Sequence, residues 1–176
     1  MSYDLDLFRP PAHGDALAVA RSAYELGDDY TPPVPDSDWR ERMHAAAAAL
    51  TEADFSLEAE HAGEGTPEEH IELNGPEEGT GLQILIFSTA AYVHLPFWHD
   101  GADADDAWEQ AWTLLRVLER ETGWRTYDPQ LDRVLDLDAD RADVRAEYAR
   151  SVATARVLAA APIIAAQQRP WWKFWA

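Results

Sequence analysis

The chain has 176 residues, of which 47% are hydrophobic, and this length predicts one domain of ordinary size with a substantial core. It contains no cysteine, which excludes disulfides, thiolate zinc sites and cysteine nucleophiles. Its formal net charge of −19 disfavours nucleic-acid binding, because so acidic a surface repels a phosphate backbone.

The charged residues are unevenly distributed along the chain. All 33 acids lie at or before Glu147, where they stand against ten arginines for a net charge of −23. The rest of the chain has no acid and four cations, namely Arg150, Arg156, Arg169 and Lys173. This change of sign, together with the helix-breaking Pro162, predicts an acidic domain over 1–161 and a tail over 162–176. An acidic body attracts basic proteins, although the same composition also serves solubility.

The first third of the chain predicts one strand followed by two helices. Residues 3–8 have the two-residue alternation of a strand. A first helix begins near Asp15 and ends at Gly27. A second helix is capped by Asp36 or Ser37, and its apolar stripe consists of Trp39, Met43, Ala46, Ala47 and Leu50.

The middle of the chain predicts a hairpin and two further strands. Residues 55–60 and 70–74 alternate between apolar and polar side chains on either side of a glycine-containing loop. Residues 82–87 are apolar on both faces apart from Gln83, which is typical of a central strand. Residues 92–98 form another strand, which puts on one face Tyr92, His94 and Trp98.

The last part of the chain completes the predicted fold. It contains a helix over 105–122, a short strand over 124–127, a second short strand or an extended piece over 134–137, and a final helix over 141–161. The order β-α-α-β-β-β-β-α-β-β-α predicts a two-layer α+β domain, with an antiparallel or mixed sheet and helices on one face. The alternation assigns to the opposite, open face Asp4, Asp6, Glu58, Glu60, His70, Glu72, Gln83, Tyr92, His94 and Trp98. The candidate binding residues of this face are Tyr92, His94 and Trp98.

Two groups of side chains have the chemistry for metal binding or acid–base catalysis. His94 and His99 precede an acidic turn, but the spacing matches neither a zinc-binding helix nor a calcium loop, and the acids instead favour the start of the next helix. The second group consists of Glu58, Glu60, His70 and Glu72. These side chains would face one another across the hairpin, but on an open face they would stay solvated, which disfavours acid–base catalysis. We therefore expect no metal, no cofactor and no catalytic residue.

The C-terminal tail has the most unusual composition of the chain. It places four aromatic rings and one cation within five residues, namely Trp171, Trp172, Lys173, Phe174 and Trp175. Rings beside a cation suit a membrane interface, and they also suit a pocket on a partner protein. A third alternative is that the tail folds back on its own acidic domain.

Two motifs carry a resemblance to other proteins. The opening Met-Ser-Tyr-Asp-Leu and the Gly-Trp-Arg-Thr-Tyr-Asp-Pro-Gln of 123–130 resemble a broad set of small uncharacterised bacterial proteins. Members tend to start with a Ser-Tyr-Asp-Leu strand and to end the domain with a helix, a short strand and a Tyr-Asp-Pro-Gln turn. The resemblance covers 1–137 in layout and implies a fold without an established activity. Some of these proteins are similar to immunity or accessory proteins of bacterial competition systems.

These observations favour a non-catalytic protein-interaction module, of an immunity-like or accessory kind, with the tail as a second contact. Its partner is an unknown protein, and a basic one fits the charge. The alternatives are a peripheral membrane protein anchored by the tail, and an enzyme that uses the histidine and acids of the sheet face. The first residues lack the basic start and apolar core of a signal peptide, and no apolar run approaches the ~20 residues of a membrane span. We expect a cytoplasmic location, with the inner-membrane surface as the alternative.

Overall fold

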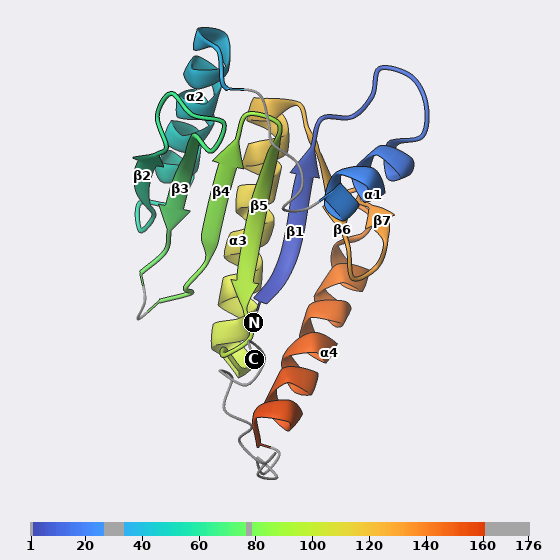
Figure 1. Cartoon of the computed structure of the whole chain (residues 1–176). Coiled ribbons are helices and arrows are strands. Elements are labelled where there is room, and N and C mark those ends of the chain that lie inside the picture. The colour runs from blue at the N-terminus through green and yellow to red at the C-terminus, as the bar shows by residue number, and fades with distance from the viewer. Residues whose placement is uncertain (1, 27–33, 77–78, 161–176) are drawn as a thin grey trace, which may run out of the picture.

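A computed structural model describes residues 2–26, 34–76 and 79–160 (Figure 1). Within this part the chain forms, in order, β1 (Ser2–Phe8), α1 (Ala16–Leu26), α2 (Ser37–Ala53), β2 (Glu58–Ala62), β3 (His70–Asn74), β4 (Gln83–Phe87), β5 (Ala90–Pro96), α3 (Gly101–Thr122), β6 (Arg125–Asp128), β7 (Arg133–Val134) and α4 (Arg141–Ala160). None of the helices in the described ranges is both long and apolar enough to cross a membrane.

The strands form one antiparallel sheet in the order β2-β3-β4-β5-β1-β6-β7. The first strand of the chain therefore lies inside the sheet, between β5 and β6. Its position follows from its sequence, because a strand that carries Tyr3, Leu5 and Leu7 on one face has a continuous apolar surface to bury. The predicted α+β class, with helices packed on a sheet, is confirmed.

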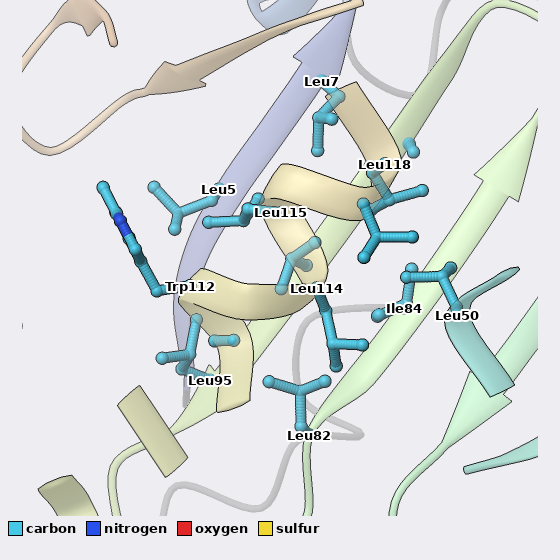
Figure 2. Close-up of a cluster of buried hydrophobic side chains, with 14 of the residues drawn as sticks. Leu5, Leu7, Leu50, Leu82, Ile84, Leu95, Trp112, Leu114, Leu115 and Leu118 are labelled. Atoms are coloured by element: carbon cyan, nitrogen blue, oxygen red, sulfur yellow. The ribbon is translucent and has the colours of Figure 1, made fainter. Parts of the chain in front are cut away.

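The core fills the space between one face of the sheet and the helices α2 and α3. Figure 2 shows leucines of β1 and α3 pointing toward one another, with Leu50 of α2 beside Ile84 of β4. The helical stripe predicted for α2 is buried at Met43, Ala46, Ala47 and Leu50. Asp36 caps this helix, since its carboxylate accepts a hydrogen bond of 2.8 Å from the amide of Trp39.

The last helix joins the same core. Val144, Tyr148 and Val152 of α4 are buried, and the ring of Tyr148 meets that of Tyr3 edge-on at 5.7 Å. The phenol of Tyr148 also donates a buried hydrogen bond of 2.9 Å to the carbonyl oxygen of Pro96. Although α4 lies beyond the layout that carries the resemblance, it is an integral part of the packing.

The helices α2, α3 and α4 share one face of the sheet, as predicted, whereas the first helix packs on the opposite face. Ala20 of α1 forms a small separate cluster with Phe8 of β1 and Tyr127 of β6. Arg21 holds the helix in place through an ion pair with Asp132, which follows β6. The open face is therefore bounded at the β1–β6 end by α1 (Figure 1).

Three predicted details are wrong. Trp98 does not continue the face of Tyr92, because β5 ends at Pro96 and the indole lies against Gly81 with 64% of its surface exposed. The strand expected from residue 55 begins at Glu58, which leaves Phe55 in a turn with 89% exposure. The helix expected to begin at residue 105 begins four residues earlier, at Gly101. Asp103, which precedes the expected start, lies in the first turn of the helix.

Candidate functional site

The open face of the sheet brings Asp6 between two tyrosines. Asp6 of β1 is the cross-strand partner of Tyr92 on β5 and of Tyr127 on β6. Directly opposite residues of neighbouring antiparallel strands point their side chains to the same face, with Cβ atoms about 5 Å apart. The carboxylate of Asp6 is therefore flanked by an aromatic residue on each side.

Further aromatic side chains extend this surface across β3, β4 and β5. The rings of His70 and Phe87 stack at 4.8 Å, and Phe87 meets Tyr92 edge-on at 5.8 Å. Tyr92 in turn stacks with His94 at 6.4 Å. At the other end of the face, Tyr24 of α1 meets Tyr127 edge-on at 6.2 Å. Strand alternation thus produces a polar-aromatic face rather than a purely solvated one.

This face contains a pocket of about 520 Å³. Its floor is made by residues of β1, β4, β5 and β6, and its sides by α1 and by the loop that carries Pro67 and Glu68. A volume of this size lies within the range of small-molecule sites, about 300–1,000 Å³. Of the described residues that line it, Asp4, Asp6 and Glu68 are acidic and none is Arg or Lys.

Asp4 and His94 form a pair at one side of the pocket. The Nδ1 atom of His94 lies 2.7 Å from Oδ1 of Asp4, and the hydroxyl of Ser2 donates a second hydrogen bond of 2.6 Å to the same oxygen. Burial alone would raise the pKa of Asp4, but the hydrogen bonds from His94 and Ser2 outweigh it and the pKa is lowered. Asp4 therefore carries its charge against a fixed partner.

Asp6 has the opposite electrostatic environment. Burial raises the pKa of its carboxyl group to about 7, and the negative charge of Asp4 adds to the shift. No hydrogen-bond donor of the described residues reaches the Asp6 carboxylate. Two acids two residues apart on one strand therefore differ, since one is paired and ionised and the other is unpaired and titrates near neutral pH.

The structure places only some of the predicted binding residues at the pocket. Tyr92 and His94 both line the pocket. Trp98 is outside it, for the reason given above. The tail residues predicted as a second contact, which are Trp171, Trp172, Lys173, Phe174 and Trp175, lie outside the described residues.

Neither of the two residue clusters considered for metal binding or acid–base catalysis forms such a site among the described residues. His94 contacts Asp4, whereas the Nε2 atom of His99 lies 2.7 Å from the carbonyl oxygen of Thr80. Glu60 and Glu72 are cross-strand partners, but Glu72 accepts hydrogen bonds from Asn74 and Gln83 that help to lower its pKa. In the part of the chain that the structure describes, no three side chains are arranged to hold a metal ion.

Several pocket residues were not singled out from the sequence. Tyr127 belongs to the turn motif of 123–130, and Tyr24 lies within the first predicted helix, but neither position indicated a binding site. Asp6 was assigned to the open face, but nothing in the alternation indicated that it would lack a partner there. The missing information is the strand order, because Asp6 meets its two tyrosines through pairings with β5 and β6.

A larger groove of about 760 Å³ runs between α3 and α4. Its charged side chains are already paired across it, because Arg141 contacts Glu109 and Arg145 contacts Asp105. The open-face pocket is a better candidate, since it combines aromatic rings with an unpaired carboxylate.

Comparison of the chain with known protein families, curated proteins and solved structures gives no significant match.

Proposed function

We propose that the protein is a non-catalytic interaction module, which binds a partner protein through the open face of its sheet. The observation that carries the proposal is the pocket around Asp6, where aromatic rings and acids lie together on a face that α2, α3 and α4 leave uncovered. Tyrosines are enriched at interfaces, because each ring gives a large contact area with little loss of conformational entropy. An immunity-like or accessory role and a second contact through the tail belong to the same proposal.

The test compares one substitution on each side of the sheet. Leu85 lines the pocket, and Leu85→Lys places a long charged side chain on the open face; Thr113→Lys makes the same change of charge on the exposed side of α3. A partner is isolated with the wild-type protein from the source cells, purified, and titrated against both variants by calorimetry. We expect Leu85→Lys to weaken binding at least tenfold and Thr113→Lys to leave it unchanged. Equal binding by both variants would contradict the proposal.

A second candidate is an enzyme that uses Asp6 with the Asp4–His94 pair. One observation favours it, because two acids in one pocket have pKa values shifted in opposite directions, and enzymes use this arrangement for acid–base catalysis. The wild-type protein would then hydrolyse a chromogenic ester, phosphoester or glycoside. That activity would be lost in Asp6→Asn and retained in Asp106→Asn, which removes an exposed acid of α3. Absence of turnover with all three substrates favours the interaction module.

A further inference from the structure

We infer that the open-face pocket binds the guanidinium group of an arginine side chain of the partner, with Asp6 as its counter-charge. This inference rests on the proposed interaction function and specifies the chemistry of the contact. The other charged or titratable groups around the site are Asp4 and His94 on the neighbouring positions of the sheet, Glu68 from the loop, and Asp128 on the far face of β6. The ion pair of Arg21 with Asp132 lies beside Tyr127, and its two charges are already paired with each other.

The geometry around Asp6 favours a flat cation. Tyr92 and Tyr127 are the direct cross-strand neighbours of Asp6. Tyr127 is buried and its hydroxyl donates to Asp132, so a cation that contacts the Asp6 carboxylate meets the partly exposed ring of Tyr92. Cations within about 6 Å of an aromatic ring are attracted by its negative face, and arginine does this more often than lysine. The planar guanidinium can stack on a ring while it donates two hydrogen bonds to one carboxylate, which the compact lysine ammonium cannot do.

The carboxylate of Asp6 also has unused capacity to accept hydrogen bonds. An ionised carboxylate accepts up to about four hydrogen bonds, yet no donor among the described residues reaches this one. Partial burial makes an unpaired charge unfavourable, whereas a cation that supplies hydrogen bonds relieves that cost. Elsewhere in this protein buried acids are satisfied, as Glu69 is by Arg40 at 2.7 and 2.8 Å. The partner's arginine would do for Asp6 what Arg40 does for Glu69.

The charges of the pocket and of the whole chain favour a basic occupant. The pocket is lined by three acids and by no described Arg or Lys, and the chain as a whole carries a net charge of −19. A potential of this sign steers basic surfaces toward the protein and repels acidic ones. The occupant that fits the acids, the rings and the volume together is therefore a basic side chain rather than an acidic or purely apolar one.

The experiment titrates the full-length, isotopically labelled protein at pH 8 with N-acetylarginine methylamide and follows backbone amide signals by NMR. The neutral analogue N-acetylcitrulline methylamide has nearly the same shape, and N-acetyllysine methylamide has the charge without the plane. We expect saturable shifts at Asp6, Tyr92 and Tyr127 with the arginine probe, weaker binding of the lysine probe, and none with citrulline. Asp6→Asn weakens arginine binding at least tenfold, and Asp106→Asn leaves it unchanged.

Three results would overturn the inference: no saturable shift in the pocket, equal binding of citrulline and arginine, or an Asp6→Asn variant that binds arginine as the wild type does. Tighter binding of lysine would overturn the choice of arginine. The proposed function is separable from this outcome. If the partner no longer binds the Leu85→Lys variant but binds Asp6→Asn with full affinity, the interaction function is supported and the arginine site is contradicted. If the arginine probe binds but Leu85→Lys leaves the partner's affinity unchanged, the interaction function falls.

Discussion

The phenol of Tyr3 donates a buried hydrogen bond of 2.6 Å to the carboxylate of Asp128. Asp128 also accepts hydrogen bonds of 2.8 and 3.0 Å from the amides of Gln130 and Leu131, so it fixes the turn after β6. The two motifs that carried the resemblance, one in β1 and one at the end of β6, are thus joined across neighbouring strands. This contact anchors the strand that carries Asp6 beside the strand that carries Tyr127.

Tyr3→Phe is expected to lower the free energy of unfolding by about 1–3 kcal/mol, because it leaves the buried Asp128 carboxylate without its phenol donor. The measurement is urea denaturation followed by tryptophan fluorescence. Tyr24→Phe is the matched control, since Tyr24 is exposed and its hydroxyl has no partner among the described residues. Equal stability of the two variants would show that the Tyr3–Asp128 bond contributes nothing.

Arg40→Ala is expected to lower the melting temperature on the order of 5 °C at pH 7, which corresponds to a small number of kcal/mol for a chain of this size. The side chain of Glu69 is fully buried and pairs with Arg40, so the substitution leaves a buried acid without its main partner. Arg42→Ala is the control, because Arg42 lies on the same helix over the ring of Trp39 and contacts no buried acid.

The Arg40–Glu69 pair also predicts how the stability of the protein changes at acid pH. Hydrogen bonds from Arg40, Gly65 and His61 lower the pKa of Glu69 to about 2 despite its burial. A lowered pKa in the folded state gives stability that is present above the ordinary carboxyl pKa and is lost as the pH falls toward 2. The difference in melting temperature between wild type and Arg40→Ala should therefore shrink from pH 7 to pH 3. A difference that stays constant over this range would contradict the assignment.

The free energy of unfolding should depend on pH in the opposite sense through Asp6. Its pKa is raised to about 7, so the folded protein binds this proton more tightly than the unfolded chain does. Its contribution to the free energy of unfolding therefore decreases as the pH rises from about 4 to about 7. Asp6→Asn should stabilise the protein at pH 8 by about 4 kcal/mol, with a smaller effect at pH 5. Carbon-13 NMR of the labelled carboxyl group gives its pKa directly, and a value near 4 would refute the assignment.

Much of the fold follows from short-range patterns in the sequence. The alternation of Tyr3, Leu5 and Leu7 predicted a strand, and all three are buried on the core face. Similarly, the apolar stripe from Met43 to Leu50 predicted a helix and the face that it buries. These predictions succeed because a strand or helix with one apolar face has a single way to bury it.

The candidate site could not be predicted from local sequence patterns, because it depends on the order of the strands. The alternation placed Asp6 and Tyr92 on the same face, but their contact requires β1 to pair with β5, and the approach of Tyr127 requires β6 on the other side. The same limit explains Trp98, because extrapolating the alternation past Pro96 assumed that the strand continued. The pKa of Asp6 likewise arises from burial under neighbours that are distant in sequence.

We propose that the open face around Asp6 is the surface that meets the partner. The most direct measurement is photo-cross-linking in the source cells, with p-benzoylphenylalanine in place of Tyr92 on the open face and, in a second protein, in place of Thr113 on α3. Tyr92 lines the pocket, whereas Thr113 is exposed on the helical side of the sheet. We predict a cross-linked adduct of one defined mass from position 92 that is absent from position 113 and is reduced by Asp6→Asn. An adduct from position 113 alone, or equal adducts from both positions, would contradict the account.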